Sequence, residues 1–305
     1  MSEKNFIETE TENLIKQWES YDQSLLADYL VQSLQDPRIN PQSILARHQL
    51  ANSIANGKFD DLAREELAWA LNANHILREY EKNHSVSVHN LSAIKGNLPE
   101  NKLYKDLYEQ LFSEQQKSYE AQWVKALTPY ATAEQKPTVL EAACGSANDY
   151  RFLESYGFGD AIKYKGFDLN KTNVETSQAR HPKAIFVLGN ILNIEEADKS
   201  WDITIMHDIF EHLHIDACYL AMKEIFRITR KKIIITYFNM DEIDEHLIKP
   251  VKLYHWNTLS RAKTEQQWRD LGAQVDVTHI GSLASEHKFT EFHNKKAYTF
   301  IVTPT

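Results

Sequence analysis

Small residues fill a segment at the end of an apolar run, and a ligand could approach the backbone closely there. Residues 141–149 read Glu-Ala-Ala-Cys-Gly-Ser-Ala-Asn-Asp and complete the apolar run at 138–143. A buried strand followed by such a turn and a helix presents backbone N–H groups to the polar atoms of a ligand. The segment therefore predicts a ligand-binding turn around Gly145, in which Cys144 fits a small buried thiol better than a reactive one.

An acidic residue follows the next apolar run at a spacing that suits a ribose. Asp168 closes the segment Gly166-Phe167-Asp168 and lies 23 positions after Gly145. A carboxylate at the tip of the second strand, roughly 20 residues on, hydrogen-bonds ribose hydroxyls in nucleotide-binding folds. This feature alone would also suit NAD. The loop nevertheless has one central glycine instead of the full G-x-G-x-x-G that a diphosphate requires, which disfavours a nicotinamide enzyme.

Histidines form a third group with chemical potential. His207, His212 and His214 follow the apolar run at 201–206. Imidazole titrates near neutral pH, so His207 and His212 are candidate bases for an oxygen or nitrogen nucleophile, although packing explains His212 equally well. Three such close residues at one strand-helix junction would not converge easily on a metal, and we expect none.

The elements that must position these residues alternate in type after Pro137. Apolar runs at 138–143, 164–167, 184–188, 201–206, 232–237 and 297–302 are separated mostly by helical patterns. Strands that alternate with helices at this spacing predict a mainly parallel sheet with helices on both faces.

The first part of the chain has a helical texture instead. Asn40 and Pro41 predict the start of a helix over 41–54, and Asn56-Gly57 predicts its end. Further helices are expected over 62–81 and 102–127, with Thr128-Pro129 as a stop and a loop over 84–100. We divide the chain into a helical segment, 1–135, and an α/β domain, 136–305. The helical segment could cover the site or form a homodimer.

The ordered segments of the second half resemble class I S-adenosylmethionine-dependent methyltransferases. Glu141-Ala-Ala-Cys-Gly-Ser-Ala is similar to the first family motif, and Gly189-Asn190-Ile191 falls where the family recognises adenine. The segment 201–213, ending in Glu211-His212-Leu213, is similar to the fourth strand of the family and to the segment that follows this strand. Tyr254-His255-Trp256 and the helix over 266–271 resemble the late segments before a terminal strand pair. The resemblance covers 138–305.

This resemblance implies a Rossmann-like, seven-stranded, mostly parallel sheet that binds S-adenosyl-L-methionine. Most of the implied cofactor contacts follow strand ends: Glu141 at the methionine amino group, the backbone of Ala143, Gly145 and Ser146 along the methionine part, Asp168 at the ribose, Leu169, Asn190 and Ile191 around adenine, and His207 and Asp208 near the sulfonium. Ala143 and Ala147 depart from the family, which often has glycine there. Alanine is tolerated there if φ stays negative, but its methyl group narrows the approach to the cofactor.

The methyl acceptor has weaker signals. Tyr237 and Asn239, at the tip of the fifth strand, and His255 are candidate substrate contacts because ligands bind at this edge of such sheets. A carboxylate acceptor would need no base, since it is already ionised. It would need a cation, for which Arg38 and Arg47 are possible sources, although either could be an ordinary surface residue.

Composition narrows the functional class. The net charge of -9 and pI near 5.8 argue against general nucleic-acid binding. Two cysteines, no signal-peptide pattern and no apolar run near the roughly 18 residues of a membrane span fit a cytoplasmic protein. We expect a methyltransferase acting on an O or N atom of a small molecule or peptide. A protein methyltransferase and a non-catalytic binding or regulatory protein are the alternatives.

Overall fold

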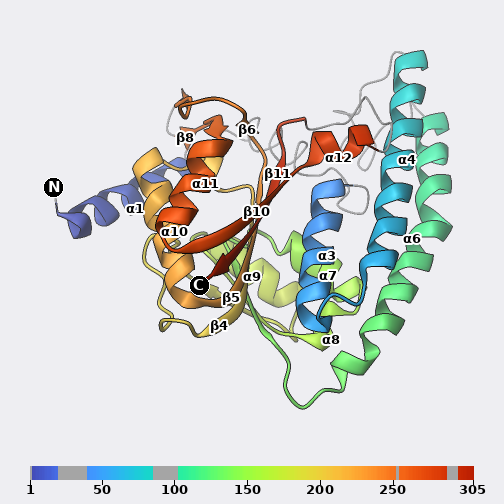
Figure 1. The fold of residues 1–305 in the computed structure, drawn as a ribbon, viewed down its shortest axis with the longest axis horizontal. Coiled ribbons are helices and arrows are strands. Elements are labelled where there is room, and N and C mark those ends of the chain that lie inside the picture. Colours follow the sequence, from blue (N-terminus) through green and yellow to red (C-terminus); the bar gives the residue numbers. More distant parts are fainter. Residues whose placement is uncertain (1, 20–39, 85–101, 252–253, 287–294) are drawn as a thin grey trace.

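The computed structural model describes residues 2–19, 40–84, 102–251, 254–286 and 295–305 (Figure 1). Arg38 and the predicted loop over 84–100, apart from its first residue, lie outside these ranges. None of the described helices combines the length and hydropathy that a transmembrane span needs.

A single seven-stranded sheet forms the centre of the molecule. Its strands are β1 (Thr138–Ala142), β2 (Lys163–Asp168), β3 (Ile185–Leu188), β4 (Trp201–His207), β5 (Thr229–Tyr237), β10 (Ala273–His279) and β11 (Tyr298–Pro304). The order across the sheet is β10-β11-β5-β4-β1-β2-β3, and β11 alone runs antiparallel to its neighbours. The predicted fold class is confirmed, because every predicted apolar run forms a strand of a mostly parallel sheet.

Helices cover both faces of this sheet (Figure 1). On one face, Met206 and Ile235 pack with α10 (Ile215–Ile228) and with Trp268 of α11 (Arg261–Asp270). On the other, Ile205 and Ile234 pack with α3 (Pro41–Ala55), α7 (Asn148–Ser155) and their neighbours. Shorter elements complete this half: α8 (Phe158–Ala161), α9 (Lys171–Arg180), η3 (Phe210–His212), β6 (Met240–Asp241), β7 (Pro250–Val251), β8 (Tyr254–His255), β9 (Leu259–Ser260) and α12 (Ile280–Glu286).

The first half contributes α1 (Glu3–Glu19), α3 (Pro41–Ala55), α4 (Asp60–His84) and α6 (Lys102–Ala131). The predicted boundaries of α3 are confirmed: the Asn40 side chain accepts a hydrogen bond from Gln42 N, and Asn56 ends the helix at φ 54°. The predicted stop at Thr128-Pro129 is wrong, because α6 continues to Ala131. Pro129 lies in the last turn, where the missing N–H removes only one helical hydrogen bond.

These helices share their core with the sheet. Ala46 and Leu50 of α3 and Trp123 of α6 belong to the same buried cluster as Val139 and Ile205. The helix α3 lies on β5 and β11, while α4 and α6 form the outermost layer (Figure 1). The helical segment and the α/β domain thus share one continuous core. The domain boundary at residue 135 therefore remains a prediction.

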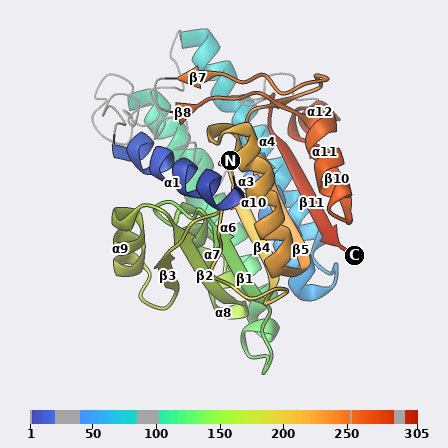
Figure 2. The same cartoon turned by 90° about the vertical axis from the view of Figure 1, so that its left-hand side faces the viewer.

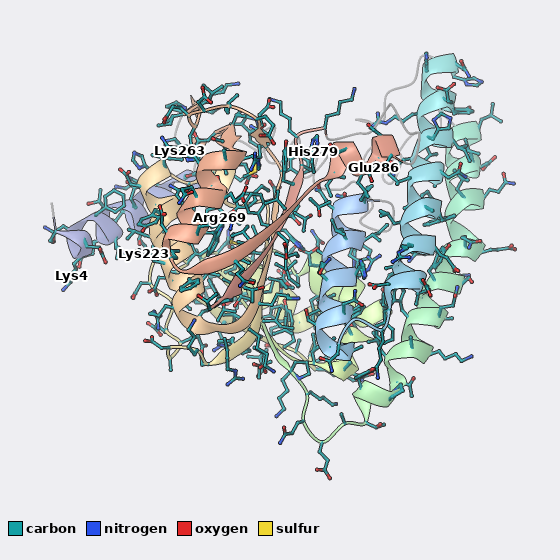
Figure 3. The ribbon with its side chains drawn as sticks, in the orientation of Figure 1. Lys4, Lys223, Lys263, Arg269, His279 and Glu286 are labelled. Carbon is teal, nitrogen blue, oxygen red and sulfur yellow. The ribbon has the colours of Figure 1, made fainter. Side chains whose placement is uncertain are left out.

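The helix α1 has a different position. It crosses the ends of β2 and β3 (Figure 2), and Thr11 accepts a hydrogen bond from Asn190 Nδ2 at 2.7 Å. At its start, Glu3 pairs with Lys223, which lies on α10 beside α1 (Figure 3). Phe6, Ile7 and Leu14 pack against the core of the α10 face.

Candidate active site

The turn between β1 and α7 adopts a strained backbone. Ala143, Gly145 and Ala147 all have φ between 54° and 58°. The negative φ that would make alanine unstrained in this turn is thus absent at both Ala143 and Ala147. Two hydrogen bonds fix the turn against the end of β2, from Cys144 N to the Phe167 carbonyl and from Gly145 N to Asp168 Oδ2, each 2.9 Å long. They offset a left-handed conformation that costs alanine roughly 1–2 kcal/mol.

Asp168 connects this turn to the next one. Its Oδ2 accepts from Gly145 N, and its Oδ1 accepts from Asn170 N at 2.8 Å. Burial raises the pKa of Asp168, against the opposing effect of these hydrogen bonds. The carboxyl group is thereby fixed at the tip of β2, beside the turn.

A pocket opens at the ends of β1, β2 and β3. Five residues predicted to contact the cofactor line it, and so does one predicted base: Ala143, Asp168, Leu169, Asn190, Ile191 and His212. Phe167, Ile209 and Leu213 make most of its wall apolar. Its cavity volume is about 100 Å³.

Sequence reasoning missed the contribution of α1 to this pocket. Leu14 and Gln17 line it, and Thr11 holds the amide of Asn190. A helical texture was expected for this part of the chain, but nothing in the sequence signals which surface its first helix covers.

Glu141 lies deeper than expected. It is buried and does not line the pocket, and its Oε2 accepts a hydrogen bond of 2.5 Å from the Tyr164 hydroxyl. Burial, with the nearby charge of Asp149, raises the pKa of Glu141 to about 8. Burial therefore favours the neutral form of this carboxyl group. Its contact with a methionine amino group remains a prediction.

His207 and Asp149 form a buried pair between the tip of β4 and the first turn of α7. Nδ1 of His207 lies 2.7 Å from Asp149 Oδ2. Burial alone would lower the pKa of His207, but the charge and hydrogen bond of Asp149 outweigh it, and the pKa is raised. No group in the described ranges bonds to His207 Nε2. Asp149 was not among the predicted site residues, although it ends the small-residue segment.

His212 and Asp208 occupy the next turn. His212 lines the pocket, and its Nδ1 lies 3.2 Å from the carbonyl oxygen of His255. Burial lowers the pKa of His212 and raises that of Asp208 to about 7. Asp208 also has a positive φ, 54°. Asp208 Oδ1 lies 3.9 Å from His212 Nε2, farther than Asp149 lies from His207. Of the two candidate bases, His207 therefore has the raised pKa and the closer carboxylate.

Comparison with known proteins agrees with this geometry. A family model described as a methyltransferase domain matches residues 139–232, from β1 into β5. The chain contains a class I S-adenosylmethionine-dependent methyltransferase domain. The family implies S-adenosylmethionine as cofactor and a methyl acceptor as the second substrate. A comparison with curated sequences gave no match.

Solved structures of low sequence identity are similar to this methyltransferase domain. A SAM-dependent methyltransferase from Methanosarcina mazei has 12% identity and a TM-score of 0.45, over 59% of this chain and 96% of its own. One from Aquifex aeolicus has 15% identity and a TM-score of 0.40, over 59% and 88%. A TehB-like SAM-dependent methyltransferase from Corynebacterium glutamicum has 14% identity and a TM-score of 0.40, over 65% and 98%.

The residues of the methyltransferase pocket fit the chemistry of S-adenosylmethionine. Asp168 offers carboxylate oxygens to ribose hydroxyls, and Leu169 and Ile191 offer apolar surface to adenine. The volume is less favourable, because about 100 Å³ is small beside the roughly 300–1,000 Å³ of ligand clefts. Leu14 and Gln17 of α1 form part of the wall, so movement of α1 would widen the pocket.

The predicted substrate contacts are dispersed. Tyr237 is buried in the α10 face, where its hydroxyl accepts a hydrogen bond from Trp268 Nε1, so the prediction that it points into the crevice is wrong. The direction follows from strand alternation, which turns its neighbour Thr236 to the other face. The amide of Asn239 donates to Asn257 O, which holds the loop before β9. His255 packs edge-on against His214, and its role remains a prediction.

Arg47 is the one predicted cation that the structure describes. It is buried under α3, and its Nη2 pairs with Glu66 at 2.8 Å. Arg47 also lies over the ring of Tyr156 at 4.0 Å. The reading of Arg47 as a surface residue is therefore wrong. With His207 and Asp149 it lines a second, smaller cavity between α3 and β4.

Proposed function

We propose that this methyltransferase transfers a methyl group to an O or N atom of a small molecule or peptide, and that His207 acts as general base. The proposal is carried by one observation, the hydrogen bond between His207 and Asp149 at the tip of β4. In this fold, ligands bind beyond the carboxyl ends of the strands. There, His207 has one ring nitrogen hydrogen-bonded to a carboxylate and its other ring nitrogen left for a substrate.

The two side chains have separate tasks. Asp149 holds the proton on Nδ1 of His207, which leaves Nε2 to accept the proton of the nucleophile. When bound, S-adenosylmethionine would supply a methyl group on a sulfonium, whose sulfur would keep the electron pair of the broken carbon–sulfur bond and leave as a neutral thioether. Nε2 of His207 would accept the proton that the nucleophile loses as it takes the methyl group. Asp149 then stabilises the imidazolium.

The helices α1 and α3 cover the site, which favours an acceptor small enough to be enclosed by them. Arg47 and Ser43 of α3 line the cavity beside His207, and α1 lines the cofactor pocket. A large polymer would have to displace these helices. A protein methyltransferase and a non-catalytic binding protein remain the alternatives. Cofactor titration combined with a methyl-transfer assay separates a non-catalytic binding protein from an enzyme.

Calorimetric titration with S-adenosylmethionine, S-adenosylhomocysteine and NADH tests the basis of this function. We expect micromolar binding of the first two and a loss of at least tenfold in Asp168→Ala, because the ribose loses its carboxylate partner. Asp276→Ala, an exposed change on β10, should bind as the wild type does. Binding of NADH alone would refute the proposal. Binding without methyl transfer from labelled cofactor to any small-molecule, peptide or protein acceptor would favour the non-catalytic alternative.

A further inference from the structure

A row of polar side chains crosses the sheet on the face that α3 covers. His207 pairs in register with Thr236, and Thr236 pairs with Thr299, on the neighbouring strands β4, β5 and β11. The isoleucines two positions away on the same strands pack with Ala46 and Leu50 of α3: Ile205, Ile234 and Ile301. Because side chains alternate along a strand, the three polar residues face α3 as well.

The facing side of α3 is also polar. Gln42 and Arg47 of α3 are both buried, and Arg47 lines a cavity with His207. We call these two residues with His207, Thr236 and Thr299 the α3 polar layer. Six of its side-chain atoms are buried without a hydrogen-bond partner in the described part of the chain: Gln42 Oε1, Arg47 Nε and Nη1, His207 Nε2, Thr236 Oγ1 and Thr299 Oγ1. Arg47 and His207 line one cavity, of about 20 Å³, together with Ser43 and Asp149.

Such a concentration of unpaired groups is unusual. Nearly all buried polar groups in native proteins have a partner, and each exception requires an explanation. Nearby groups in the same region follow the rule, since Glu66 accepts hydrogen bonds from Arg47, Trp123 and Tyr156. Glu66 holds Arg47 through Nη2 and leaves Nε and Nη1 without an acceptor. The unpaired groups therefore indicate a place for a polar ligand. Because the cavity of about 20 Å³ holds little more than one water, α3 would have to move for a larger ligand to enter.

The layer is separate from the cofactor pocket. In the sheet, β1 lies between β2 and β4. The pocket lies over the ends of β1–β3 and is closed by Ile209, His212 and Leu213 after β4, whereas the layer lies on the face of β4, β5 and β11 that α3 covers. None of the five layer residues lines the cofactor pocket. His207 stands at the border of the two, at the tip of β4.

We propose that the α3 polar layer is the acceptor site, and that it binds the carboxylate of a small hydroxy or amino acid through Arg47. This proposal rests on the proposed function and specifies the acceptor class. The unpaired atoms are mostly donors: Arg47 Nε and Nη1 carry three N–H groups, and the threonine hydroxyls can donate as well. Charged hydrogen bonds from arginine to a carboxylate are strong and directional.

The carboxylate serves recognition, while a second group reacts. With its carboxylate on Arg47, the acceptor would place a hydroxyl or amine toward Nε2 of His207. Gln42 Oε1 offers the layer an acceptor for a further donor on the ligand. The site thus combines an anchor and a base on two elements, α3 and β4.

The first test compares two threonine variants. Thr299→Val removes an unpaired hydroxyl, so we expect a higher melting temperature and unchanged affinity for S-adenosylhomocysteine, but weaker acetate binding. Thr204→Val is the matched control, because Thr204 is buried and paired with Thr229 at 2.6 Å on the other face. It should lower the melting temperature and leave acetate binding unchanged. A Thr299→Val protein that binds acetate as the wild type does would refute the site.

The second test uses acetate and its neutral isostere acetamide. The Nε–H resonance of Arg47 is followed by NMR, with and without saturating S-adenosylhomocysteine. We expect saturable shifts with acetate, binding at least tenfold tighter than acetamide, and no loss of binding when S-adenosylhomocysteine is present. Equal binding of acetamide, or no saturable shift, would overturn the carboxylate assignment. Displacement of acetate by S-adenosylhomocysteine would assign Arg47 to the cofactor instead.

The two proposals fail in different ways. The acetate titration without any nucleoside reports the layer alone, whereas calorimetry with S-adenosylhomocysteine reports the cofactor pocket. Loss of cofactor binding with intact acetate binding would contradict the proposed function only.

Discussion

Asp149 and His207 are 58 positions apart in the chain, yet they form the closest pair of charged partners near the strained turn. Burial is unfavourable for both charges, but each charge stabilises the other. The pKa of Asp149 is therefore lowered and that of His207 raised. The contribution of His207 to folding is complete below its unfolded pKa near 6.5 and is lost as the pH rises through the raised folded value. A base with a raised pKa reaches its active, neutral form at a correspondingly higher pH.

Asp149→Asn tests this pair directly. Without the carboxylate charge, burial dominates, and the pKa of His207 should fall below its wild-type value in an NMR titration of the imidazole. Transfer to an acceptor that must lose a proton should slow by about 10²- to 10⁴-fold, while cofactor affinity is retained. Glu154→Gln, elsewhere on α7, is the control and should leave the titration of His207 unchanged. An unaltered pKa in Asp149→Asn would contradict the pairing.

At the scale of elements, α1 matters most for access to the cofactor pocket. It is held by apolar contacts of Phe6 with the core and with the ring of His214, at 6.1 Å between centroids, and by the bond between Thr11 and Asn190. Most described side chains of this helix of 17 residues are exposed or only partly buried, which should make it easier to displace than the helices of the main core. We expect the cofactor to enter and leave as α1 moves.

Phe6→Ala should loosen this helix without touching the pocket, since Phe6 does not line it. We expect amide hydrogens of α1 to exchange about tenfold faster and S-adenosylhomocysteine to dissociate several-fold faster in stopped-flow measurements, from a loss of about 1–2 kcal/mol of docking energy. Ile15→Ala, on the exposed side of the same helix, should change neither rate. Equal dissociation rates in both variants would show that α1 does not control access.

The sequence predicted features that depend on local patterns. The cap at Asn40, the stop at Asn56 and the strands follow from residue types that act on their own neighbours. The position of Asp168 beside Gly145 follows from the parallel pairing of β1 and β2. Features that depend on how distant segments pack could not be predicted. They include the position of α1 across the ends of β2 and β3, the Asp149–His207 pair and the burial of Tyr237 in the α10 face. Because side chains alternate along a strand, a shift of one residue along β5 would have turned Tyr237 to the other face.

At the scale of the whole molecule, Glu66 connects the helical part to the sheet. This buried carboxylate on α4 accepts hydrogen bonds from Arg47 on α3, Trp123 on α6 and Tyr156 at the end of α7. Its partners come from both sides of the proposed boundary at residue 135. The helices and the methyltransferase domain should therefore unfold together.

Glu66→Gln should lower the stability of the entire molecule by about 3–5 kcal/mol, because Arg47 would remain buried without its counter-charge. Circular dichroism and tryptophan fluorescence should report one coincident transition in urea for the wild type and the variant. Glu65→Gln, its exposed neighbour, should change stability by less than about 0.5 kcal/mol. Two separate transitions would support an independent helical domain.

The unpaired groups under α3 also bear on how much of this protein a cell maintains. A ligand that satisfies them binds the folded chain only, so at about a hundred times its dissociation constant it adds about 2.7 kcal/mol to folding. Chains without ligand would be degraded sooner, since proteolysis follows the unfolded fraction. We expect the half-life of the protein in cells, and its yield on purification, to follow the supply of its own acceptor.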